Sequence, residues 1–399
     1  MLLGAAATSH AADSNVVNNQ TQLGNVESGQ TLDVVTVDDG VTAITSATGN
    51  GLTAGAETGS LDVQSTQSMQ GNATGTTTLN VSDGGYSGAS SSLTTAATGN
   101  TVEASISGGG DMTSTVTQTT GPVSITTDSQ INAGLAETGD VTASSQAIAN
   151  SAGIGASTGY SGTTVNQTST ALTQSDGGAT VQYTAGALSL ASTAVSNNLT
   201  ATGTDGAAQD VTATQSMTGA RTQAAQFVAV GNGQTVTNAA TATANNISAT
   251  GEWNPLNVVT VQDNTGYVRA QAETTSYEFG SSSSLAYGVG NSVMAGEVGS
   301  DLSLNNTQTN SGDGVQVIAS STGNNGYDLS GTATAMGNAV TGYSCSSCGG
   351  TVNVGNSQYN SADVGTTSTV SFTSSARSVI GVATSVGNSA TFYTTKPTN

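Results

Sequence analysis

The sequence is poor in the residue types on which most enzymes and nucleic-acid-binding proteins depend. It contains one histidine, two cysteines and three prolines, and its four Lys or Arg stand against 25 Asp or Glu, for a formal charge of −21. So acidic a chain offers no basic surface to nucleic acid or to an anionic membrane. Only 4% of its 399 residues are aromatic and 35% are hydrophobic, so a packed interior must be thin and built from small side chains.

The single histidine lies in a segment that we expect to be removed. Residues 1–11 (MLLGAAATSHA) resemble the end of a signal peptide, because Ser9, His10 and Ala11 have the small-x-small form of a cleavage site. We therefore expect an exported chain with one repetitive domain over residues 12–399. Without histidine, neither a Ser-His-Asp triad nor a His-based metal site can form, and we expect no catalytic residue, metal or cofactor.

The residues that are abundant favour β-strands. Runs such as LDVVTV (32–37), VQVIAS (315–320) and STVSFTS (368–374) alternate in polarity and are rich in β-branched residues. No stretch shows the periodicity of an amphipathic helix. The composition therefore predicts an all-β fold.

Two sequence markers recur along the chain with a period of about 48 residues. The first is a strand that ends in Gln, at Gln20, Gln67, Gln118, Gln167, Gln215, Gln262, Gln308 and Gln358. The second is a small-residue strand that reaches Asn, as in ATAMGNAV (333–340), at Asn50, Asn100, Asn150, Asn198, Asn246, Asn291, Asn338 and Asn388. Two markers with one period predict eight repeats of a β-solenoid.

We interpret the markers as corners and ladders of this solenoid. Gly followed by Asn supplies the positive φ angles of a tight corner, and stacked Asn or Gln amides can hydrogen-bond along a column. A 48-residue unit is about twice an ordinary β-helix turn, so we expect two coils per repeat; three flatter coils of about 16 residues are the alternative. About sixteen coils spaced near 4.8 Å would give an elongated rod on the order of 75 Å long.

Few other residues point to a specific site. Cys345 and Cys348 lie in an inserted corner loop, where a local disulfide is expected in an exported protein. Asp38 and Asp39 form the densest acidic run, which predicts a solvated corner or, in a sharper interpretation, a weak Ca²⁺ site.

Aromatic and basic residues gather in the second half of the chain. Residues 1–220 contain no Lys or Arg, whereas Arg221, Arg269, Arg377 and Lys396 and seven of the ten Tyr follow. Sugars are bound by aromatic faces with polar neighbours. The candidate sugar contacts are therefore Trp253, Tyr267, Arg269, Tyr277 and Tyr287.

Strand-Gln and Ala-x-Gly-Asn units repeated along an acidic, exported, histidine-free chain resemble the holdfast anchor protein D family of stalked alphaproteobacteria. The resemblance implies a non-enzymatic cell-surface protein at the outer membrane that fastens an adhesive polysaccharide to the envelope. The implied partners are that polysaccharide, a small curli-like subunit and a secretion lipoprotein, with self-association as a further expectation. Fragments such as TQSMQGNAT (66–74) also look like curli repeats, but the period here is about 48 residues instead of near 22.

Other classes of protein share a long β-solenoid. A polysaccharide-degrading enzyme or a tail-fibre-like protein would gather three or more carboxylates with an Arg in one groove. A lattice protein resembling an S-layer subunit would form ordered sheets with Ca²⁺.

Overall fold

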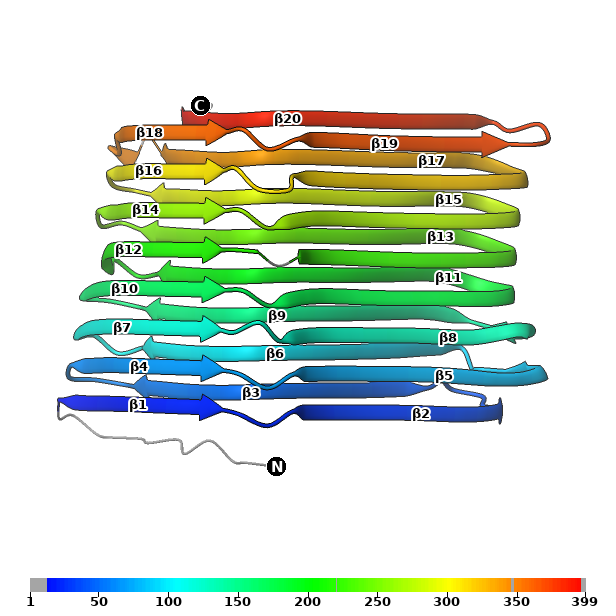
Figure 1. Cartoon of the computed structure of the whole chain (residues 1–399), viewed down its shortest axis with the longest axis horizontal. Coiled ribbons are helices and arrows are strands. Elements are labelled where there is room, and N and C mark those ends of the chain that lie inside the picture. The colour runs from blue at the N-terminus through cyan, green and yellow to red at the C-terminus, as the bar shows by residue number, and fades with distance from the viewer. Residues whose placement is uncertain (1–12, 220, 346–347, 396–399) are drawn as a thin grey trace.

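The molecule is a stack of parallel coils, each made of a short strand, an outgoing strand and a long return strand (Figure 1). The computed structural model describes residues 13–219, 221–345 and 348–395, and these form strands and turns without an α-helix. Within those ranges no helix is long and apolar enough to cross a membrane.

The short strands pair side by side in an eight-stranded parallel sheet. In order across the sheet they are β1 (Ser14–Gln22), β4 (Leu61–Met69), β7 (Asp111–Thr120), β10 (Tyr160–Ser169), β12 (Ala208–Met217), β14 (Leu256–Asn264), β16 (Leu302–Asn310) and β18 (Val352–Asn360).

The outgoing and return strands belong to a second parallel sheet that folds around the opposite corner. In the end regions they are separate strands: β2 (Val26–Thr36), β5 (Ala73–Tyr86), β8 (Ser124–Thr138) and β19 (Val364–Phe372) go out, and β3 (Thr42–Ala56), β6 (Ser90–Ile106), β9 (Asp140–Ala156) and β20 (Ser378–Thr395) return. In the intervening coils one strand makes the whole journey: β11 (Leu172–Gly203), β13 (Arg221–Glu252), β15 (Tyr267–Val298) and β17 (Val315–Cys345).

Strand register shows that each repeat makes one coil. Gln20 of β1 pairs with Gln67 of β4, its counterpart in the next repeat, and Gln67 pairs in turn with Gln118. The expectation of two coils per repeat was therefore wrong, because the return strand alone spans 15 to 18 residues where it is separate. Eight coils at about 4.8 Å give a stack of about 38 Å. The longest axis of one copy accordingly runs along the strands (Figure 1), and the molecule is a slab, not the rod of about 75 Å.

The core is a thin layer between the return strands on one side and the short and outgoing strands on the other. Leu61 and Val63 of β4 pack with Ala54 of β3 and Val102 of β6. Alternate residues face inward along every such strand, as in β4, whose burial alternates along its length. Ala, Val, Ser and Thr dominate these inward positions, which explains why so small a hydrophobic fraction suffices.

The corners are made by glycines other than those of the Gly-Asn marker. Gly59, Gly159 and Gly299 have positive φ angles and lie where a return strand leads into the next short strand. The marker glycines, such as Gly49 and Gly99, lie inside β3 and β6 and have no positive φ. The assignment of Gly-Asn to a corner was therefore wrong.

Candidate functional site: two amide columns and a cationic face

The eight marker glutamines form one continuous column inside the solenoid, here called the glutamine column. Each side chain from Gln67 to Gln358 donates a hydrogen bond through Nε2 to Oε1 of the preceding marker glutamine, at 2.7–2.9 Å. The same Nε2 also donates to a carbonyl of the return strand; Gln67, for example, donates to the Thr101 oxygen at 2.9 Å. The column thus ties neighbouring coils together and the two layers to each other.

A second column, the asparagine column, runs up the return strands. Its members are Asn50, Asn100, Asn150, Asn197, Asn245, Asn291, Asn338 and Asn388, and each Nδ2 donates to Oδ1 of the next at 2.7–2.8 Å. Each of the first seven also donates to a carbonyl in the opposite layer, as Asn100 does to the Thr119 oxygen at 3.0 Å. Asn acts from one layer and Gln from the other, so the cross-links are reciprocal.

Two members of this column differ from the sequence-based assignment. In the fourth and fifth coils two asparagines are adjacent, and the inward-facing ones are Asn197 and Asn245, both fully buried. Asn198 and Asn246, which the marker spacing selected, are only half-buried and bond to each other at 2.8 Å outside the column. Successive side chains of a strand point to opposite faces, so a shift of one residue removes a side chain from the interior.

The residue before each column Asn must be small because the strand packs closely there. A Cβ on Gly99 would lie 2.6 Å from the Ala149 carbonyl oxygen, and one on Gly337 would lie 2.5 Å from the Gly387 carbonyl oxygen. Gly99 and Asn100 are both buried, so the inward alternation shifts by one residue at this point. The Gly-Asn marker therefore records a close approach within a strand.

The sequence analysis missed a third, shorter column. Asn264 donates to Asn310 at 2.8 Å and Asn310 donates to Asn360 at 2.6 Å, two residues after the marker glutamines of the last three coils. The earlier coils carry other residues at this position, among them Met69 and Met217. An Asn two residues after Gln in three successive repeats was the available signal.

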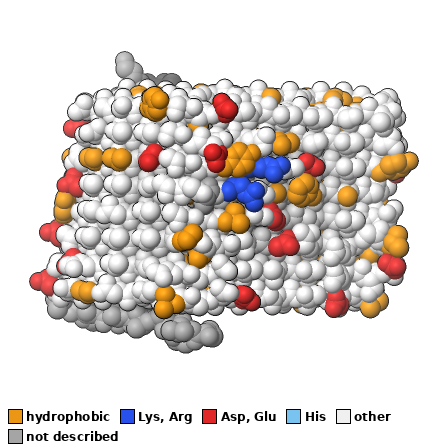
Figure 2. Space-filling model, in the orientation of Figure 1, with side chains coloured by type: hydrophobic (Ala, Val, Ile, Leu, Met, Phe, Trp, Pro, Cys, Tyr) orange, Lys and Arg blue, Asp and Glu red, His pale blue; other side chains and the backbone are white. Residues whose placement is uncertain are grey.

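The outer surface carries one cationic face, defined by Arg221, Arg269 and Tyr267. Arg221 begins β13 and pairs with Tyr267 of β15, and Arg269 follows two residues later on the same side of β15. Figure 2 shows two basic side chains side by side, with apolar and acidic side chains around them. Arg221 Nη2 donates to Gln174 Oε1 at 3.2 Å, and Arg269 donates to Gln271.

The charges of this face are not neutralised by ion pairs. The ion pair that the described residues do form joins Arg377 to Asp328, at the distant corner. Burial raises the pKa of Asp176, which lies beside Arg221, although a hydrogen bond from Gln174 and the Arg221 charge oppose the shift. Sequence reasoning had selected Arg269 and Tyr267 but not Arg221, whose proximity follows only from the register.

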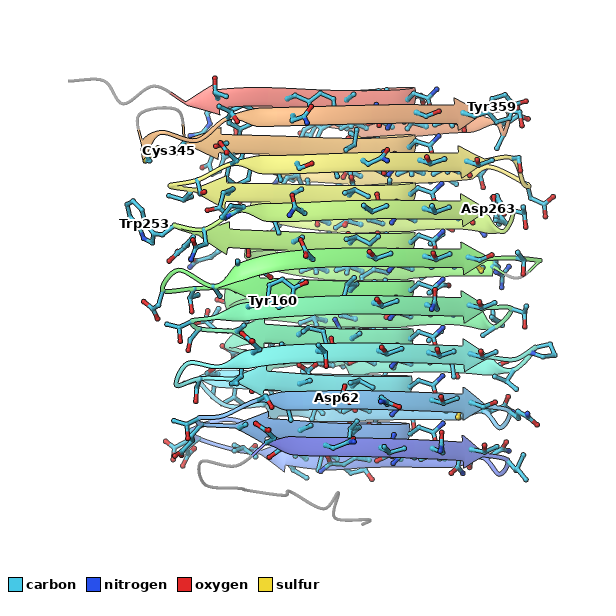
Figure 3. All side chains as sticks on the ribbon, turned by 90° about the vertical axis from the view of Figure 1, so that its left-hand side faces the viewer. Asp62, Tyr160, Trp253, Asp263, Cys345 and Tyr359 are labelled. Carbon is cyan, nitrogen blue, oxygen red and sulfur yellow. A yellow bond between two sulfur atoms is a disulfide. The ribbon has the colours of Figure 1, made fainter. Side chains whose placement is uncertain are left out.

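The remaining candidate sugar contacts do not join this face. Trp253, which is 61% exposed and has a positive φ of 67°, lies at the turn between β13 and β14 (Figure 3). Tyr277 is exposed at the opposite corner, where β15 turns back. Tyr287 is half-buried on the return part of β15, with its hydroxyl 3.9 Å from Met336 Sδ. The five residues are therefore distributed over three sides of the molecule.

Two other candidate sites have simple geometry. Cys345 and Cys348 form a disulfide with a Cα–Cα distance of 5.4 Å at the end of β17. Asp38 and Asp39 are exposed in the turn between β2 and β3, and no group of three or more His, Cys, Asp or Glu lies together in the part of the chain that the structure describes.

Fold and columns define the class of protein as a parallel β-solenoid of long coils whose thin interior is cross-linked by amides. A family model described as holdfast attachment protein D matches residues 35–314, and the chain belongs to this family, as its repeats predicted. No curated protein and no solved structure matches the chain. The family places the chain among proteins of holdfast attachment at the cell surface or envelope.

Proposed function

We propose that the protein is an exported, non-enzymatic anchor at the outer membrane that holds an acidic adhesive polysaccharide through its cationic face. The observation that carries this proposal is the pair Arg221 and Arg269, two guanidinium groups on adjacent strands without a carboxylate partner in an otherwise acidic molecule. Planar guanidinium groups bind carboxylates through paired hydrogen bonds, and the Tyr267 ring beside them offers a face for sugar C–H groups.

The amide columns support a mechanical role. Each coil is bonded to the next by backbone pairing and by two buried side-chain amides, so a load on the outer face is distributed over several coils. The curli-like subunit and the secretion lipoprotein remain the proposed envelope partners. We further propose that the protein associates with itself, and the ends of the solenoid bear on that proposal.

The test measures binding of the purified full chain to immobilised polygalacturonate, an acidic polysaccharide, and to dextran, a neutral one. We expect retention on polygalacturonate alone, weakening with salt. Replacing both guanidinium groups (Arg221→Gln with Arg269→Gln) should weaken binding at least about tenfold, because hydrogen bonds between charged groups are worth roughly 1.5–3 kcal/mol each.

The matched control is Arg377→Gln, which removes one positive charge from the distant corner and should leave binding almost unchanged. Equal losses in both variants would show a general charge effect and contradict the assignment of the site. Trp253→Ala separates the exposed indole from the cationic face, because only the former is lost.

A further inference from the structure

The two ends of the solenoid are open sheet edges. β1, β2 and β3 form the first coil and β18, β19 and β20 form the last, at opposite ends of the stack (Figure 1). Their inward side chains are only half-buried in β1, β2, β18 and β19, whereas those of the intermediate coils are buried. An open edge of this kind is a template for another strand.

The amide columns give the two ends opposite and complementary hydrogen-bonding groups. In the glutamine column donors point toward the first coil, so Gln20 Nε2 has a hydrogen beyond its bond to the Gly51 carbonyl. At the other end Gln358 Oε1 accepts only a long 3.4 Å contact from Asn356. The asparagine column runs the other way: in the described residues Asn50 Oδ1 accepts no hydrogen bond, and Asn388 Nδ2 donates none.

The spacing of these groups allows both columns to continue at once. Gln20 and Asn50 are separated by 30 residues, and so are Gln358 and Asn388, while the second coil has 33 between Gln67 and Asn100. If Gln358 lies against Gln20 of another copy, apolar inward residues meet apolar ones. The matching pairs, last coil first, are Val354 with Val16, Val364 with Val26, Val370 with Leu32 and Phe372 with Val34.

The charges of the two ends also match. The first coil carries Glu27, Asp33, Asp38 and Asp39 and no basic residue. In the last coil Asp363 is offset by Arg377, whose side chain is 71% exposed and which falls opposite Asp39 in the same alignment. Two first coils would bring their carboxylates together, so this charge pattern favours opposite ends over like ends.

We infer that copies of this chain join head to tail, with the last coil of one copy pairing in register with the first coil of the next, so that both amide columns continue through the junction. Asn388 then donates to Asn50 of the next copy and to the carbonyl oxygen of its Thr21, as column asparagines do inside one chain. The product is a fibre with an axial repeat of about 38 Å per copy. This inference concerns the ends only and does not depend on sugar binding.

Disulfide cross-linking tests the register. In a Cys345→Ser, Cys348→Ser background, one preparation carries Thr21→Cys and another Tyr359→Cys; both positions are exposed, and Tyr359 lies on the last coil (Figure 3). In-register neighbours lie about 4.8 Å apart, within the Cα range of disulfides. Mixing the two under mild oxidation should give a covalent dimer.

The controls distinguish the alternatives. Thr21→Cys mixed with Asn353→Cys should give little product, because that cysteine is about 20 Å farther along the strand. Thr21→Cys alone should give none. A dimer from Thr21→Cys alone would show head-to-head pairing, and absence of the mixed dimer would overturn the inference and leave the edge to another protein.

A second variant removes only the outward-pointing donors. Asn388→Asp keeps the oxygen that accepts from Asn338 but has no Nδ2, so the coil itself should fold normally. Circular dichroism should be unchanged, while the concentration needed for fibres, followed by sedimentation and electron microscopy, rises at least about tenfold. Asn305→Asp adds the same charge at an exposed position on β16 and should assemble normally. Unchanged assembly of Asn388→Asp would refute the continuation of the column.

Discussion

Replacement of Asn197 by Ala should weaken the middle of the solenoid far more than the same change at Asn198. Asn197 is fully buried and makes three side-chain hydrogen bonds: it donates to Ser216 O at 3.0 Å and to Asn245 Oδ1 at 2.8 Å, and it accepts from Asn150 at 2.8 Å. At about 1 kcal/mol each, their loss costs about 3 kcal/mol, and it leaves two neighbouring amides short of a partner. Asn198 is half-buried and its side chain makes one bond, so its loss should cost below about 1 kcal/mol.

Hydrogen–deuterium exchange is the appropriate assay, because the stability of a solenoid is close to a sum over neighbouring coils. We expect amide exchange in β11 and its neighbours β9 and β13 to accelerate about 100-fold in Asn197→Ala, which corresponds to about 3 kcal/mol. Asn198→Ala should change it less than about fivefold. Comparable acceleration in the two variants, or a larger one in Asn198→Ala, would refute the position of the column.

Two further changes test the packing and a buried acid. Gly337→Ala should cost about 1–3 kcal/mol in urea unfolding, because its Cβ would lie 2.5 Å from a carbonyl oxygen, while Gly365→Ala, with nothing within 4 Å, should be nearly neutral; equal midpoints would contradict the close approach. Burial raises the pKa of Glu297 to about 7, so its contribution to stability is fully present below its unfolded pKa of about 4.3 and is lost as pH rises through 7. Glu297→Gln should therefore flatten the fall in melting temperature between pH 5 and pH 8, and exposed Glu57→Gln should not; a profile unchanged by Glu297→Gln would refute the pKa assignment.

The sequence predicted the solenoid because its markers are tied to the one position where a wrong residue is costly. A buried amide needs partners in the coils on both sides, so Gln67 or Asn100 recurs at the repeat distance whatever the surrounding strands contain. The number of coils per repeat did not follow, because a period gives the distance between equivalent residues and not how far the chain travels before it turns. A return strand of 17 residues, such as β6, was needed to settle it.

The cationic face was only partly accessible from the sequence. Tyr267 and Arg269 lie two residues apart, so a strand necessarily places them on one side. Arg221 is 48 residues before Arg269 and joins them only because Arg221 pairs with Tyr267 in the register of β13 and β15. Trp253 and Tyr277 are equally close in sequence to Tyr267, but turns at either end of the strand carry them away.

The opposed directions of the two columns have an electrostatic consequence for length. Side-chain amides are dipoles, and a single column of them would add up along the axis much as peptide groups do in a helix. Here the glutamine donors point toward the first coil and the asparagine donors toward the last, so their moments oppose each other in every coil. Repeats can therefore be gained or lost without a growing field along the axis, and the length of the stack is free to follow mechanical need.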